Sequence, residues 1–82
     1  MSKQPGLLFH QNLAAGRVLR HTSGQLIRVR KQMQGFDGSF EHINRHGERD
    51  KRFAVGWSGR LEKAQWKIER SRLAERRKPY HP

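Results

Sequence analysis

Arginine side chains alternate with apolar ones in residues 27–30, and this pattern is the clearest indication of chemistry in the sequence. Successive side chains of a strand point to opposite faces of its sheet, so Ile27 and Val29 would face a core while Arg28 and Arg30 face outward. A guanidinium group can bind a guanine edge with two hydrogen bonds, and asparagine can do the same for adenine. The pattern predicts a sheet face that contacts nucleic acid, the alternative being an ordinary solvated strand face.

Two further stretches would add polar side chains to the same face. Residues 39–46 are rich in β-branched and aromatic side chains, and in residues 51–57 Phe53, Val55 and Trp57 alternate with Arg52 and small residues. Both patterns favour strands. The register between the strands decides which of their side chains face outward. The sheet candidates for nucleic-acid contact are Arg28, Arg30, Asn44, Arg45 and Arg52.

A second basic surface is expected on a C-terminal helix. Residues 60–77 contain no proline or glycine and consist mainly of good helix formers, and Ser58 is well placed as the N-cap. On such a helix one side would carry Lys63, Lys67, Arg70 and Arg77. These cations would contact phosphates, or they would simply form the solvated face of the helix. Trp66 and Leu73, seven residues apart, would form a small apolar stripe that could serve as an interface.

Catalysis and metal binding are not expected. The sequence has no glycine-rich phosphate loop, no nucleophile elbow and no pair of carboxylates in apolar surroundings. His42 and His46 have a spacing that would suit a metal site on a helix. On a strand their rings would lie about 13 Å apart, and no third ligand is evident. We therefore predict no enzyme activity, no metal and no cofactor.

The composition indicates a polyanionic partner. The chain has 82 residues, a formal net charge of +11 and no cysteine. It has no apolar run approaching the roughly 18 residues that a membrane-spanning helix needs, and we expect no membrane partner. The absence of cysteine fits a reducing compartment. The expected location is the cytoplasm of a bacterial cell or of a phage-infected host.

The predicted fold that positions these residues belongs to the α+β class. Residues 17–33 would be extended, with a turn at Ser23 and Gly24 between two short runs, and strands would follow in 39–46 and 51–57. This small antiparallel sheet of about three strands would be packed by one C-terminal helix. The predicted organisation is an N-terminal arm over 1–16, a single sheet-plus-helix domain over 17–77 and a loose tail over 78–82. Residues 7–15 of the arm would form a short helix or extended segment, which either folds back onto the domain or inserts into a partner.

The C-terminal half carries a resemblance. The segment RFAVGWSGRLEKAQWKIERSR (residues 52–72) resembles AP2-like DNA-binding domains and the related arm-type domains of phage integrases. In those domains a strand of the kind seen in residues 52–55 leads into a helix with spaced alanines, and Ala64 and Arg70 stand in comparable places. The resemblance covers about residues 25–75 through short motifs, and the usual glycine-aromatic opening of the first strand is missing. It implies that the sheet enters the major groove, with Arg28, Arg30 and Arg45 as readers.

These observations together predict a small basic protein that binds double-stranded DNA, as a regulatory or accessory protein of a bacterium or phage, for example in transcription regulation. The affinity would come largely from phosphate contacts and would depend strongly on salt. One alternative is an RNA-binding component of a ribosome-like assembly. Another is a protein inhibitor that places its basic face on an acidic groove of its target. The oligomeric state stays open.

Overall fold

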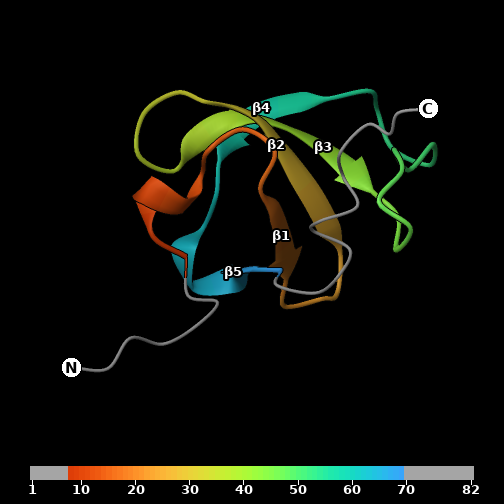
Figure 1. Cartoon of the computed structure of the whole chain (residues 1–82), viewed down its shortest axis with the longest axis horizontal. Helices are drawn as coiled ribbons and strands as arrows, with labels where there is room; N and C mark the ends of the chain where they lie inside the picture. The colour runs from red at the N-terminus through yellow and green to blue at the C-terminus, as the bar shows by residue number, and fades with distance from the viewer. Residues whose placement is uncertain (1–7, 70–82) are drawn as a thin grey trace.

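The computed structural model describes residues 8–69 and shows a single antiparallel β-sheet of five strands (Figure 1). Two short 3-10 turns, η1 (His10–Asn12) and η2 (Lys63–Gln65), accompany the sheet. Within this part of the chain no helix has the length and apolar character needed to cross a membrane. The strands are β1 (Val18–His21), β2 (Leu26–Gln32), β3 (Asp37–Ile43), β4 (Trp57–Arg60) and β5 (Trp66–Ile68).

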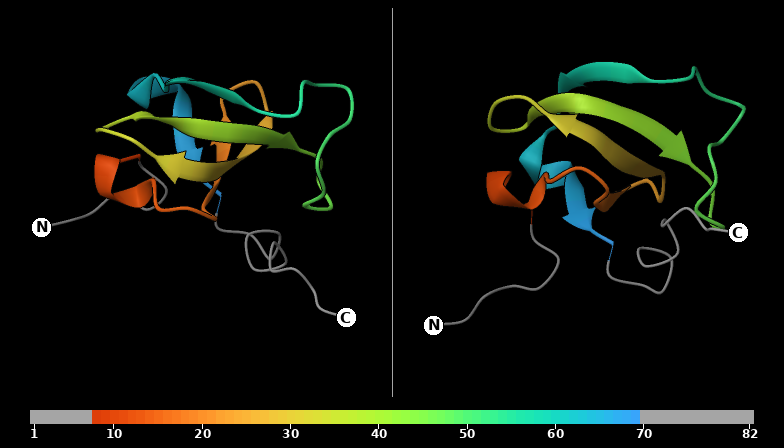
Figure 2. Two further views of the ribbon diagram at one scale, coloured as in Figure 1. Left: turned by 90° about the horizontal axis from the view of Figure 1, so that it is seen from above. Right: turned by 45° about the horizontal axis from the view of Figure 1, so that its top comes forward.

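The strand order makes the sheet curl. Neighbours follow the order β4-β3-β2-β1-β5, so β4 and β5 lie at opposite edges although only residues 61–65 connect them. A connection this short, part of it a 3-10 turn, is easily accommodated when the two edges bend toward each other, and Figure 2 shows the strongly curved sheet that results. Curling gives the sheet a concave inner face and a convex outer face, and the two faces have different roles.

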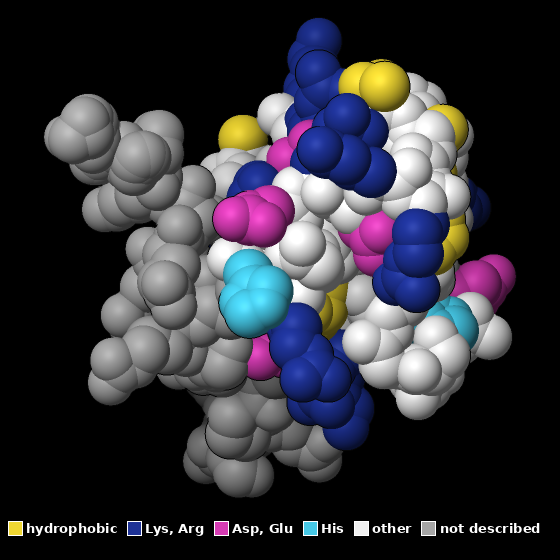
Figure 3. Space-filling view, turned by 90° about the vertical axis from the view of Figure 1, so that its right-hand side faces the viewer, with side chains coloured by type: hydrophobic (Ala, Val, Ile, Leu, Met, Phe, Trp, Pro, Cys, Tyr) yellow, Lys and Arg dark blue, Asp and Glu magenta, His cyan; other side chains and the backbone are white. Residues whose placement is uncertain are grey.

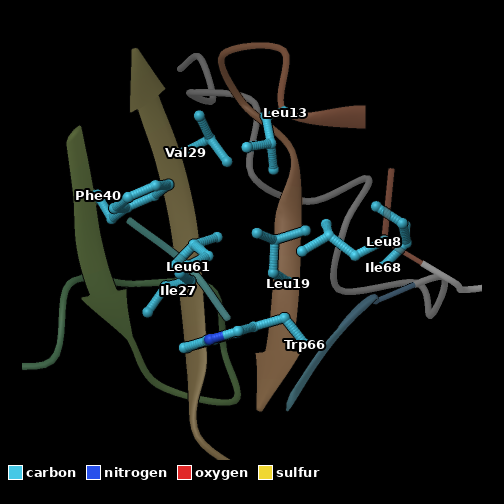
Figure 4. Close-up of a cluster of buried hydrophobic side chains, with 9 residues drawn as sticks. All are labelled: Leu8, Leu13, Leu19, Ile27, Val29, Phe40, Leu61, Trp66 and Ile68. Carbon is cyan, nitrogen blue, oxygen red and sulfur yellow. The ribbon is translucent and has the colours of Figure 1, made fainter. Parts of the chain in front are cut away.

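The core lies on the inner face (Figure 4). In a cross-strand row, Ile68 of β5, Leu19 of β1 and Ile27 of β2 stand opposite one another. In a second cross-strand row, Val29 of β2 stands opposite Phe40 of β3. The buried cluster comprises Leu8, Leu13, Leu19, Ile27, Val29, Phe40, Leu61, Trp66 and Ile68, and Trp57 of the β4 edge packs against it. Side chains from both edge strands therefore meet in one core, which stabilises the curl by burying apolar surface.

The N-terminal segment belongs to this core. Leu8 and Leu13 are fully buried, on either side of η1. The Gln32 side chain of β2 fixes the segment from outside by donating from Nε2 to the His10 carbonyl oxygen at 2.6 Å. Of the two fates considered for residues 7–15, the described part, from Leu8 onward, folds back onto the sheet.

The expected C-terminal helix is not what the structure shows, and the prediction of an α+β fold is wrong for the described residues, which form a β-sheet. In place of the helix, Arg60 ends β4, Leu61 enters the core, and residues 66–68 form β5. Trp66 and Ile68 are buried while Lys67 is exposed, a period of two that suits a strand. Pairing with β1 supplies hydrogen-bond partners to an otherwise open edge, and this tertiary gain exceeds the local helix propensity. Residues 70–77 of the expected helix lie outside the described residues.

The strand expected at residues 51–57 is also wrong. The chain forms a turn at 51–52, Val55 is 64% exposed, and β4 begins only at Trp57, opposite Phe40. Phe53 and Val55 therefore do not lie on one face of a strand, although their alternation in the sequence suggested it. The connection between β3 and β4, residues 44–56, is instead shaped by polar side chains. The strands at 17–33 and 39–46 are found as β1, β2 and β3, with small shifts of their ends.

The core assignment of the N-terminal segment can be tested by paired truncations. Leu13→Ala should lower the free energy of unfolding by about 2–5 kcal/mol, because it removes a fully buried side chain and leaves a cavity. Val55→Ala, at an exposed position, should change it by no more than about 0.5 kcal/mol. Urea denaturation followed by tryptophan fluorescence measures both. Equal losses in the two variants would contradict the packing described.

Candidate nucleic-acid interface

The outer face of the sheet carries arginines, but most of them are paired. Arg28 and Glu41 are cross-strand partners, and Nη1 of Arg28 donates to Oε2 of Glu41 at 3.0 Å. Nη2 of Arg28 donates to the Gly47 carbonyl oxygen at 2.6 Å, and only 17% of the side chain is exposed. Arg28 thus links β2, β3 and the following connection. Because both terminal amino groups of Arg28 already donate hydrogen bonds within the protein, few donors remain for the edge of a base.

Two more ion pairs lie on the same outer face. Each joins neighbouring strands or their immediate continuation, so acidic residues neutralise the arginines row by row. The pairs are Arg20 with Glu69 at 3.1 Å and Arg60 with Asp37 at 3.5 Å. Arg20 and Arg60 are more than half exposed, and such pairs contribute little to stability. Their main effect is on the field, because the face carries less free positive charge than the count of arginines suggests.

The free positive charge gathers instead in the connection after β3. We call residues 44–52 the basic loop; they contain two carboxylates, Glu48 and Asp50, and a larger number of cations. The cations are Arg45, Arg49, Lys51 and Arg52. All four residues are exposed, and the first three have no ion pair with a described carboxylate. Figure 3 views the molecule from the side on which this connection lies in Figure 1, and shows Lys and Arg side chains there with carboxylates between them.

Asn44 organises the first half of the basic loop. Its Oδ1 accepts hydrogen bonds from the backbone N–H groups of His46 at 2.8 Å and of Glu48 at 3.0 Å. The backbone of Asn44 pairs with Glu48, and Gly47 takes the left-handed conformation that the turn requires, with φ of 85°. Asn44 was a candidate for base contact. Its side-chain oxygen has a structural role in this loop.

Asp50 organises the second half. Its Oδ1 accepts from the backbone N–H of Arg52 at 3.0 Å, and its Oδ2 accepts from Nη2 of the same residue at 2.7 Å. The hydrogen bonds from the Arg52 side chain, and then from its backbone, lower the pKa of the Asp50 carboxyl group to about 2. The Arg52 side chain is nevertheless 81% exposed. Arg52 therefore combines a fixed position with access to solvent.

The aromatic side chains at this end of the sheet support the loop. The His42 ring stacks on Phe53, with ring centroids 4.0 Å apart and planes 20° from parallel, and Trp57 lies beyond it. Burial lowers the pKa of His42, an effect that the nearby Asp50 carboxylate opposes, so the ring is neutral at physiological pH. Among the described residues Phe9 is the one large aromatic side chain that is exposed, at 40%. The described surface therefore offers no cluster of aromatic rings on which bases could stack.

The remaining candidate residues are scattered. Arg30 is exposed at an irregularity of β2, Lys63 lies in η2 with its Nζ 5.5 Å from the centroid of the Phe9 ring, and Lys67 stands opposite Arg20 on β5. Trp66 is buried in the core and packs edge-on against His21, so its large ring is not an exposed interface patch. Arg70, Leu73 and Arg77 lie outside the described residues.

Sequence reasoning missed two members of the basic loop, Arg49 and Lys51. A strand was expected over residues 51–57, which left no room for an extended loop. The density of charge in residues 45–52, with four cations and two carboxylates among eight residues, was the available signal. Within residues 8–69 no group of three or more histidine or acidic side chains is placed to hold a metal ion.

Comparisons of the chain with protein-family models, curated proteins and solved structures give no match. The family resemblance noted from the sequence is therefore neither supported nor excluded. The helix that it implies is not formed in the described residues.

The role of Asp50 can be tested by titration. Since its pKa is lower in the folded chain than in the unfolded chain, ionised Asp50 stabilises the fold above about pH 4, and this contribution is lost as the pH falls toward 2. Carboxyl ¹³C NMR should give a midpoint near 2 for Asp50. Arg52→Ala should move that midpoint up toward the ordinary value of 3.8. A wild-type midpoint near 3.8 would contradict the hydrogen bonding described.

Proposed function

We propose that this protein binds a nucleic-acid duplex, in the first place double-stranded DNA, and that it does so mainly through phosphate contacts. The observation that carries the proposal is the basic loop, in which exposed cations are displayed on a backbone that Asn44 and Asp50 hold in place. The formal charge of +11 provides long-range attraction to any polyanion.

The internal hydrogen bonds of the basic loop bear on affinity. A flexible loop loses conformational entropy when it binds, whereas a loop that is already ordered loses less. The hydrogen bond from Arg28 to the Gly47 carbonyl oxygen ties the loop to β2. Phe53, the residue that follows the loop, stacks on His42 and ties it to β3. The cations at its tip are long side chains that can adapt to the irregular spacing of phosphate oxygens. An ordered backbone with adaptable charged ends suits contact with a nucleic-acid backbone.

The distribution of aromatic side chains favours a duplex over a single strand. Proteins that bind single strands stack bases on exposed aromatic rings. Here Phe40 and Trp66 are buried, and Phe53 is stacked on His42. A duplex presents phosphates and needs no such platform.

The ion pairs of the outer face favour weak sequence preference. Phosphate contacts position a protein but carry no sequence information directly. Arg28, one of the three readers named in the sequence prediction, has its terminal amino groups occupied by Glu41 and Gly47. The proposed mode of binding is therefore electrostatic, and the affinity should fall steeply with salt.

Charge-matched double variants test this proposal. Arg45→Ala with Lys51→Ala removes two cations of the basic loop, whereas Arg17→Ala with Lys63→Ala removes two exposed cations elsewhere. For duplex DNA, the first pair should reduce the slope of log K against log salt by about 1.8, because each lost phosphate contact reduces it by about 0.9. The second pair should leave the slope nearly unchanged. Fluorescence anisotropy across about 50–300 mM salt measures both.

The outcomes separate the proposal from its rivals. Equal slope changes in the two double variants would show attraction to the net charge alone and would contradict a role for the basic loop. A clear preference for structured RNA over duplex DNA would indicate the RNA-binding alternative. Negligible binding to all nucleic acids, with retained binding to an acidic protein, would indicate the inhibitor alternative.

A further inference from the structure

A row of polar side chains crosses the outer face of β2, β3 and β4. Ser39 pairs with Lys31 on one side and with Ser58 on the other. Ser39 and Ser58 lie next to Phe40 and Trp57, which point into the core, so the two serines face outward. Lys31 shares their face as a direct cross-strand partner, and cross-strand neighbours have their Cβ atoms about 5 Å apart. The row therefore brings one ammonium group and two hydroxyl groups close together.

Arg30 joins this row because of a bulge. The pairing of β2 with β3 skips from Val29 to Lys31, which leaves Arg30 as the extra residue of β2. Bulges re-aim side chains and are common next to functional sites. The Arg30 guanidinium group extends to Gly56, where a Cβ atom built on the glycine would lie 2.6 Å from Nη1. Gly56 precedes Ser58 by two residues, or about 7 Å of extended chain, so the guanidinium group lies one step along the outer face from the Ser58 end of the row.

The charges flanking the row are already neutralised. Glu41 and Asp37 lie two residues from Ser39 along β3 in either direction, and they pair with Arg28 and Arg60. Arg30 and Lys31 are exposed and have no ion pair with a described carboxylate. The row and Arg30 thus present two cations that no neighbouring carboxylate of the described chain neutralises, together with two hydroxyl groups that can donate hydrogen bonds.

We propose that Arg30, Lys31, Ser39 and Ser58 bind one phosphate group of the nucleic-acid backbone. The inference rests on the proposed function and deepens it, because it assigns a directional contact beside the adaptable ones of the basic loop. The planar guanidinium fork matches two phosphate oxygens, the ammonium group adds a point charge, and the hydroxyl groups donate hydrogen bonds. Gly56 is a positioning residue, since its lack of a side chain leaves room for the guanidinium group.

The geometry allows this phosphate site and the basic loop to contact one duplex. From Ser39 to Asn44, β3 and its end span about 17 Å at roughly 3.3 Å per residue. A stretch of duplex of that length carries about ten phosphates. A duplex lying along β3 could therefore contact the row near the start of the strand and the basic loop at its end.

Two variants disturb the guanidinium group without removing the charge. Arg30→Lys keeps the charge and loses the fork. Gly56→Ala keeps the arginine and displaces its terminal group; Gly56 has no positive φ, and the close contact is with the end of a flexible side chain, so the backbone should accept alanine. Each variant should weaken binding to a labelled duplex of about 20 base pairs by about tenfold, with an unchanged salt slope. Arg17→Lys, the matched control at an exposed arginine outside both contact surfaces, should change the affinity less than about twofold.

A double-mutant cycle shows whether Gly56 acts through Arg30. In an Arg30→Ala background, Gly56→Ala should have no further effect, because the group that it displaces is gone. Circular dichroism of each full-length variant confirms folding before binding is measured. A persistent effect of Gly56→Ala in the Arg30→Ala background would overturn the assignment.

The remaining outcomes distinguish failure of the phosphate site from failure of the proposed function. Absence of duplex binding by the wild-type protein would overturn the proposed function. Wild-type binding that Arg30→Lys alters no more than Arg17→Lys does would overturn the phosphate site alone. Duplexes of only A·T or only G·C pairs complete the test. An equal penalty on both supports a phosphate contact, whereas a penalty confined to G·C duplexes would overturn it in favour of a guanine contact.

Discussion

The pairing of β5 with β1 is the interaction on which the rest of the structure depends. It places Ile68 opposite Leu19 and Trp66 opposite His21, so that the last described strand supplies two side chains to the core. It also brings Glu69 to Arg20 on the outer face. Without this pairing β1 would be an open edge, and the inner face would lack Trp66, one of its two tryptophan side chains. The inner face then could not bury Leu8 and Leu13 so completely, because one wall of the core would be missing.

The curl imposed by this pairing separates the two kinds of side chain. The core cluster of apolar side chains lies on the concave face, while on the convex face Arg20, Arg28 and Arg60 pair with carboxylates. The resulting ion pairs are individually weak, but they determine which cations stay available to a partner. Arg28 is held by Glu41, whereas Arg30, two residues away at an irregularity of β2, has no ion pair with a described carboxylate. The two arginines of β2 therefore differ in how available they are to a partner.

Sequence reasoning recovered the central hairpin and β3 because their alternation and turn residues are local signals. It assigned Ile27 and Val29 to the core and the arginines of β2 to the outer face. It failed from residue 51 onward, where non-local forces dominate. The helix propensity of residues 60–69 is outweighed by the hydrogen bonds that residues 66–68 form with β1. This pairing joins segments far apart in the sequence, so no local pattern reveals it. The pairing of Arg28 with Glu41 and the position of Arg30 depend on strand register and a bulge, which the sequence pattern left undetermined.

The burial of Leu8 and Leu13 in one cluster with Ile68 has a consequence for how the protein is made. Residues from near both ends of the described chain meet in one core, so some of its stabilising contacts join segments that are distant in sequence. Closing such contacts costs loop entropy before it is repaid, which slows folding. During translation the central hairpin can form early, yet its apolar face stays uncovered until β5 has left the ribosome. The nascent chain therefore completes this sheet only after β5 has emerged, and shortened products that end before Trp66 would expose that face to aggregation.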